Sequence, residues 1–205
     1  MQAADPAMCS TVVFFREGPN TTVFDPRGNC WQRPVLIHEI SSCEPCYSWN
    51  IYHSWQLADR YRFLEGMYSL LAGALSRQTY ISCETRHGIY GNIFASPLLV
   101  DLIRLSVVDD QIAEEELHLL RLVPLAWLRT DYLTKFENMP TEFGPVTITF
   151  KLTGQSTALD ISYKSEFRDQ PKRVLLHVPP VAGLEQVIIN GRPVEAGPGE
   201  ILSIE

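Results

Sequence analysis

Residues 146–163, VTITFKLTGQSTALDISY, contain two short segments in which apolar and polar side chains alternate. Every second residue is apolar from Val146 to Leu152, and the same pattern returns from Leu159 to Tyr163. Alternation with a period of two is typical of a β-strand with one buried face. Between the two segments, residues 153–157 include a glycine and suit a hairpin turn. This stretch therefore predicts two antiparallel strands joined by a short loop.

Further strands are expected downstream of this hairpin. Apolar residues dominate the segments 173–178 and 201–204, and each segment has the length of a single strand. Asn190-Gly191 separates two apolar runs, and this dipeptide favours a two-residue turn because Asn and Gly both tolerate a positive φ. We therefore expect residues 129–205 to form a small antiparallel β-sandwich domain.

The region upstream of the strands has the periodicity of helices. One helix is expected over residues 52–75, where apolar residues recur at alternating steps of four and three and so share one helix face. Further apolar residues widen this face, which favours burial between neighbouring helices. The face consists of Leu57, Tyr61, Leu64, Tyr68, Leu71 and Leu75, and it is widened by Phe63, Met67, Leu70 and Ala74.

Two more helices are expected before the strands begin. Ser96-Pro97 offers an N-cap residue followed by proline at the first helical position, and this helix should end near Val108. A third helix should start at residues 114–116, because three glutamates in a first turn interact favourably with the helix dipole, and Pro124 should limit it. Residues 51–128 are therefore predicted to form a helical region.

The first fifty residues give a weaker pattern. Pro, Gly and Asn recur there at short intervals, with only brief apolar runs, which indicates an irregular segment with one or two short strands. The fold class expected for the whole chain is α+β, in which an N-terminal irregular and helical region is followed by a small antiparallel β-sandwich domain.

Composition limits the classes of partner. The formal charge of −7 would repel a phosphate backbone, so nucleic acid is not expected as a partner. No apolar run approaches the roughly 20 residues that a membrane-spanning helix needs, so no membrane partner is expected. Residues 1–10 lack the features of a secretory signal, and the sequence predicts a cytoplasmic protein if Met1 is the natural start.

The order of these elements, with the stretch LHLLRLVPLAWL at residues 117–128 before the strands, resembles the C-terminal end of α/α-toroid glycoside hydrolases. The α-L-fucosidase-like families are the most similar. The resemblance covers about residues 51–205. It implies that the helical region is part of an α/α toroid and that the substrate is a carbohydrate. It also implies that the partner of an exposed helical face is the remainder of the parent enzyme, or a second copy of the chain.

The loop at residues 80–91, YISCETRHGIYG, concentrates the residue types that sugar sites use. Carboxylates transfer protons, Arg and His hold hydroxyl groups, and aromatic faces stack on pyranose rings. We therefore expect Glu84 to be catalytic and Tyr80, Arg86 and His87 to bind substrate.

Two helical residues, Trp55 and Glu65, are expected to complete the substrate-binding set. They belong with Asp59 and Arg62 to a polar stripe at helical spacing. Glycoside hydrolysis normally requires two carboxyl groups, and Glu65 or Asp59 is the first candidate to pair with Glu84.

A structural interpretation competes with each part of this site. Glu84 and Arg86 form an exposed ion pair in that interpretation, and His87 is an ordinary loop residue. The polar stripe is then a solvated helix face.

No metal or cofactor is expected. Cys43-Glu44-Pro45-Cys46, with His38 and His53 nearby, has the ligand types of a zinc site but lacks the second cysteine pair of a strong motif. His118 and His177 lie in apolar surroundings typical of structural histidines.

The function expected from these observations is that of the C-terminal portion of a glycoside hydrolase, acting on oligo- or polysaccharides and incomplete as a catalyst alone. The alternative is a non-catalytic module that binds carbohydrate or only completes a fold.

Overall fold

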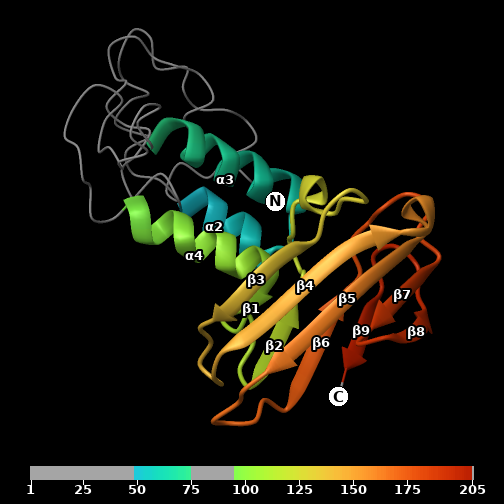
Figure 1. The fold of residues 1–205 in the computed structure, drawn as a ribbon. Coiled ribbons are helices and arrows are strands. Elements are labelled where there is room, and N and C mark those ends of the chain that lie inside the picture. The colour runs from blue at the N-terminus through green and yellow to red at the C-terminus, as the bar shows by residue number, and fades with distance from the viewer. Residues whose placement is uncertain (1–48, 75–94, 205) are drawn as a thin grey trace, which may run out of the picture. The chain divides into compact units, whose positions relative to one another are not determined.

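The computed structural model describes residues 49–74 and 95–204 and divides the chain into two compact units, residues 1–103 and 104–205 (Figure 1). The first unit contains helices α2 (Trp49–Gln56) and α3 (Arg60–Ala74), and helix α4 (Ala95–Val107) begins in it and ends in the second. The second unit contains the nine described strands, from β1 to β9. The chain is therefore α+β, as the sequence predicts. Among the described helices, none is long and apolar enough to cross a membrane.

Helices α2 and α3 occupy the stretch where the sequence predicts one continuous helix. Ala58, in the left-handed region with φ of 54°, interrupts it. The amide of Asp59 donates to the carbonyl of Ser54, and the amide of Ala58 donates to that of Trp55, which is the hydrogen-bond pattern of a Schellman C-cap. The Asp59 carboxylate then accepts a hydrogen bond from the backbone amide of Arg62 at 3.1 Å and caps α3. Asp59 thus lies between the end of one helix and the start of the next.

The first unit buries one part of its apolar surface and exposes another. Tyr52 on α2 donates a hydrogen bond to Asp101 on α4, at 2.8 Å. Four residues of the expected buried face are exposed instead: Leu57 is 50% exposed, Tyr61 63%, Tyr68 40% and Leu71 39%, whereas Leu64 is half-buried. Leu57 follows the end of α2, and the other three lie on α3; we call Tyr61, Tyr68 and Leu71 the α3 stripe. The buried apolar side chains of this unit are Ile51, Trp55, Phe63, Met67, Leu99 and Leu102.

The third helix is not formed, and this part of the prediction is wrong. Residues 108–119 contain β1 (Val108–Asp109) and β2 (Glu116–Leu119). Strand β2 pairs with β1 on one side and with β6 (Arg173–His177) on the other, so its backbone groups are satisfied by neighbours rather than within a helix. The helical region expected over residues 51–128 therefore ends with α4.

The strands of the second unit form two sheets. The four-stranded sheet has the order β1-β2-β6-β9, where β9 is Ile201–Ile204. The five-stranded sheet has the order β3-β4-β5-β7-β8. Its strands are β3 (Thr134–Met139), β4 (Val146–Thr153), β5 (Ala158–Ser165), β7 (Gln186–Ile189) and β8 (Arg192–Glu195).

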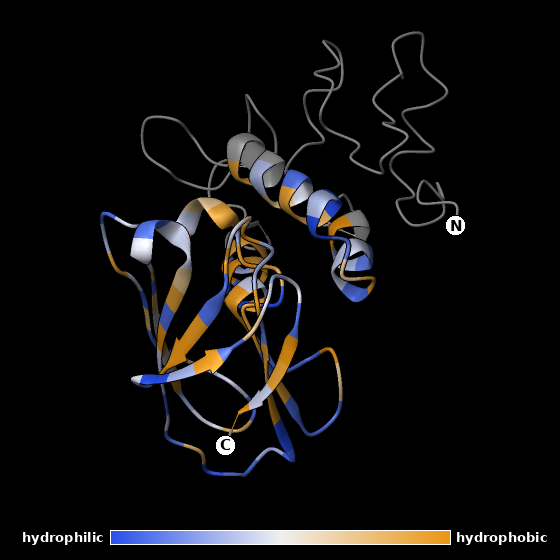
Figure 2. Ribbon diagram, turned by 90° about the vertical axis from the view of Figure 1, so that its right-hand side faces the viewer, coloured by the Kyte–Doolittle hydropathy of each residue, from blue (hydrophilic) through white to orange (hydrophobic). Residues whose placement is uncertain are grey.

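Most of the expected strands are confirmed. Strands β4 and β5 pair in antiparallel register around a short loop, as the alternation predicts. Asn190 and Gly191 connect β7 to β8 with φ of 50° and 78°, which is the two-residue turn expected from the sequence. Bands of hydrophobic and hydrophilic residues along these strands can be followed in Figure 2.

The sheets are mixed rather than purely antiparallel. Strand β2 is parallel to β6, and β5 is parallel to β7. The chain leaves β5 for the other sheet, forms β6 there and returns to place β7 beside β5. Such a crossover connection gives a parallel pair.

One hydrophobic core joins the two sheets of the second unit. Buried residues of both sheets belong to a single cluster, for example Leu119 and Leu176 from one sheet and Ile148 and Phe150 from the other. This is the arrangement expected of a β-sandwich. The sheets also include β1 and β2, which lie upstream of residue 129, where the expected β-domain begins.

Candidate functional site

The loop expected to carry catalysis lies outside the described residues. This applies to the catalytic candidate Glu84 and to Tyr80, Arg86 and His87. The Cys43-x-x-Cys46 pair lies outside them as well. Among the described residues, no group of three or more His, Cys, Asp or Glu side chains is placed to hold a metal ion.

The helical candidates are described, and their surroundings are those of packing residues. Trp55 is 7% exposed and meets the Tyr52 ring edge to face, with 6.3 Å between the ring centroids. Glu65 is half-buried on α3. Asp59 and Arg62 form a local ion pair at 3.5 Å next to the helix cap. The polar stripe thus contains a helix cap and a buried aromatic side chain.

The second unit contains a chain of polar side chains that spans β2 and β6. The parallel register places Glu116 opposite Arg173, and the two side chains form an ion pair. The second oxygen of Glu116 lies 3.2 Å from Nε2 of His118. Nδ1 of His118 lies 2.8 Å from Nε2 of His177. We call these four residues the histidine relay.

Electrostatics in the histidine relay follow from burial and charge. The hydrogen bond from Arg173 lowers the pKa of the Glu116 carboxyl, so Glu116 is ionised at neutral pH. Burial lowers the pKa of His118 below its ordinary value of 6.5, although the Asp109 and Glu116 carboxylates oppose this effect. A neutral His118 can donate from one ring nitrogen and accept at the other. The histidines therefore extend a hydrogen-bonded path away from an ionised glutamate.

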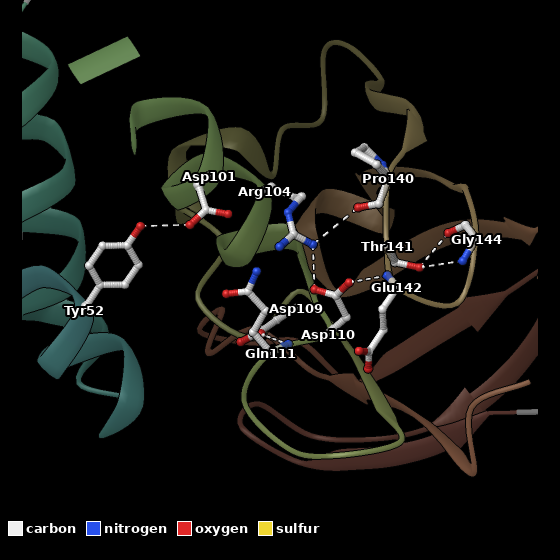
Figure 3. A network of polar contacts seen from close by, with 10 residues as sticks. All are labelled: Tyr52, Asp101, Arg104, Asp109, Asp110, Gln111, Pro140, Thr141, Glu142 and Gly144. Atoms are coloured by element: carbon white, nitrogen blue, oxygen red, sulfur yellow. Dashed lines mark hydrogen bonds and ion pairs between the residues drawn. The ribbon is translucent and has the colours of Figure 1, made fainter. Parts of the chain in front are cut away.

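Two buried ion pairs lie at the start of the second unit. Asp109 accepts a hydrogen bond from Arg121 at 3.4 Å, and both side chains are buried. Arg104, at the end of α4, donates to Asp110 at 2.6 Å and to the carbonyl of Pro140 at 3.3 Å (Figure 3). The other Asp110 oxygen accepts the Glu142 amide at 2.7 Å. These contacts connect α4 to the β3–β4 loop.

A cavity of about 660 Å³ lies where β5 ends and β6 begins. Its lining also includes residues of β9 and of the β7–β8 turn, and we call it the β5–β6 cavity. Arg173 lines the cavity and also belongs to the histidine relay. Six of its lining residues with aromatic or neutral polar side chains are Tyr163, Ser165, Phe167, Gln170, Asn190 and Ser203.

The Tyr163 hydroxyl is buried beside this cavity. Among the described residues, its oxygen is the one buried side-chain polar atom without a hydrogen-bond partner. The Ser165 hydroxyl lies close enough to lower the pKa of Tyr163 but does not reach hydrogen-bond geometry, and burial raises that pKa more strongly. A buried hydroxyl without a partner is costly, and this oxygen is too buried for a ligand in the cavity to contact it directly.

Sequence reasoning missed both the histidine relay and the cavity. His118 and His177 stand 59 positions apart, and only the parallel pairing of β2 with β6 brings them together. The alternation of Arg173, Leu175 and His177 with Val174 and Leu176 was the available signal for one shared face on β6.

Comparison of the chain with protein families, with curated proteins and with solved structures finds no match.

Proposed function

We propose that this chain is the C-terminal portion of a glycoside hydrolase acting on oligo- or polysaccharides, with its β-sandwich placed after a helical region that belongs to a larger α/α toroid. The order of a helical unit followed by a two-sheet unit with its own core supports this proposal. This support is an analogy between architectures. It concerns the fold, and the chemistry is argued from the residues of the site.

The observation that carries the proposal is the α3 stripe. Its three residues are between 39% and 63% exposed, although they have the spacing of one helix face. Apolar residues exposed along one helix face are typical of a surface that another element covers. Neighbouring helices of a parent enzyme provide such a cover, and a catalytic cavity at the ends of those helices would include the loop at residues 80–91.

In this proposal Glu84 transfers the proton to or from the glycosidic oxygen, and Arg86 and His87 hold sugar hydroxyls. Tyr80 stacks on the sugar ring, and Trp55 and Glu65 support the site from α2 and α3. The second carboxylate required by the reaction is Glu65 or Asp59, or a residue of the parent enzyme.

The test is turnover of neutral aryl glycosides and oligosaccharides by the complete protein, compared with its Glu84→Gln variant. The amide keeps the size of the side chain and removes proton transfer, so kcat should fall by about 100-fold or more with little change in KM. Glu114→Gln, an exposed glutamate in the second unit, is the matched control and should keep wild-type turnover. Wild-type turnover in Glu84→Gln would remove Glu84 from the mechanism, and a complete protein without glycosidase turnover would reject the function.

A non-catalytic module is the second candidate, and the independence of the second unit favours it. Among the described residues, the core cluster of that unit draws all its members from residues 107–204. A module of this kind predicts glycan binding without turnover, whatever residue stands at position 84.

A further inference from the structure

We propose that the β5–β6 cavity binds one neutral, hydroxyl-rich sugar ring of a glycan, separately from the loop at residues 80–91. The choice of ligand class rests on the proposed function, but the position and chemistry of the site rest on the second unit alone. The volume of about 660 Å³ falls in the range of about 300–1,000 Å³ that small-ligand sites occupy.

Two aromatic side chains give the cavity apolar surfaces. Phe167 is held against the buried Phe143 ring, with 6.3 Å between the centroids and an angle of 78° between the planes. Tyr163 packs against the core of the sandwich and lines the cavity as well. Sugar rings expose C–H faces that pack on aromatic surfaces, so these two residues suit a pyranose.

Polar side chains around these surfaces match hydroxyl groups. Ser165 and Ser203 each offer a donor and two acceptor positions, and Gln170 offers amide donors and a carbonyl acceptor. Asn190 adds its side-chain amide donors, because its side-chain oxygen already accepts the Tyr163 amide. A ligand rich in hydroxyls supplies both donors and acceptors and so complements this mixed set.

Charge favours a neutral ligand over an anionic one. The two cations of the lining, Lys172 and Arg173, form ion pairs with Glu115, which precedes β2, and with Glu116, the first residue of β2. An anionic ligand would have to displace these carboxylates, and the net charge of −7 on the chain would oppose its approach.

The site is held in place by backbone hydrogen bonds. The Asn190 amide donates to the carbonyl of Ile161 at 2.9 Å, and the Asn190 side-chain oxygen accepts the Tyr163 amide at 2.8 Å. The β7–β8 turn is thereby fixed to the end of β5. Preorganised contacts reduce the entropic cost of binding a small ligand.

Saturation-transfer difference NMR on the full 205-residue chain tests this inference, with D-glucose, D-galactose and D-mannose as probes and D-glucuronate as the anionic comparison. At least one neutral sugar should bind saturably, and D-glucuronate should bind less tightly. Ser165→Phe fills the cavity and should weaken binding by about tenfold or more, equivalent to about 1.4 kcal/mol. Ser162→Phe is the matched control, because Ser162 lies on the same strand, is exposed and does not line the cavity.

Gln170→Ala, an exposed cavity residue, provides a second variant if Ser165→Phe does not fold, and it should weaken binding without lowering the melting temperature. Turnover of Glu84→Gln tests the catalytic proposal, whereas binding to Ser165→Phe and Gln170→Ala tests the cavity, so failures of the two proposals give different results. The inference is overturned if no neutral sugar binds or if D-glucuronate binds more tightly. Loss of binding in Ser162→Phe, or wild-type binding in both cavity variants, overturns it as well.

Discussion

The two units of this chain differ in how far their apolar side chains are buried. In the β-unit, the buried apolar residues of both sheets form one cluster, and the buried carboxylates Asp109 and Asp110 are paired with arginines. In the helical unit, the α3 stripe is exposed although its spacing is that of a buried face. The β-unit thus packs its buried apolar side chains into one core, whereas the helical unit keeps apolar side chains of α3 exposed.

Asp110→Ala should lower the stability of the β-unit strongly. The substitution removes the Asp110 carboxylate from Arg104 and removes the acceptor of the Glu142 amide, so the free energy of unfolding should fall by about 3 kcal/mol. Urea unfolding of the full chain, followed by β-sheet circular dichroism, measures this change.

The control for this experiment is Asp160→Ala, which removes an exposed carboxylate from β5 in the same unit. It should change the free energy of unfolding by no more than about 0.5 kcal/mol. Equal urea midpoints for wild type and Asp110→Ala would show that the Arg104 ion pair is not part of what holds the β-unit together.

The free energy of unfolding of the β-unit should also depend on pH, by a smaller amount. Burial lowers the pKa of His118 in the folded chain, so the unfolded chain binds more protons once the pH falls below about 6.5. The stability of the β-unit is therefore complete above this pH, decreases below it, and levels off where His118 also becomes protonated in the folded chain. The neighbouring groups that set this balance are Asp109, Glu116, Arg121 and His177.

Unfolding of wild type and His118→Gln between pH 5 and pH 8 measures the effect, with the pH range chosen around the ordinary pKa of histidine, about 6.5. His118→Gln should flatten the dependence on pH, and His53→Gln, in the helical unit, should leave the slope of the β-unit unchanged. The same slope in wild type and His118→Gln would show that the histidine relay does not couple protonation to folding.

Local sequence patterns predicted the elements that local interactions determine. The alternation in β4 and β5, the Asn190-Gly191 turn and the Ser96-Pro97 start of α4 each specify a conformation within a few residues. Strand β3 was missed because none of its residues is fully buried and half of them are exposed, and it is recognised as a strand only through its pairing with β4.

The errors have a common physical origin, which is the influence of neighbours distant in the sequence. Residues 114–119 have the composition of a helix start, but pairing with β1 and β6 makes β2 a strand. The helical period placed Tyr61, Tyr68 and Leu71 on one face, but it did not reveal the break at Ala58, and a period does not distinguish a buried face from an exposed one. The contact between His118 and His177 likewise follows from strand pairing and from no local motif.

Sedimentation velocity of the isolated chain tests most directly whether the α3 stripe associates with another protein surface. The account predicts that the wild-type chain self-associates with increasing concentration and binds an apolar dye. It also predicts that a variant combining Tyr61→Ser, Tyr68→Ser and Leu71→Ser sediments as a monomer and retains the circular dichroism of the β-unit. A wild-type chain that sediments as a monomer at every concentration and binds no dye would contradict the account.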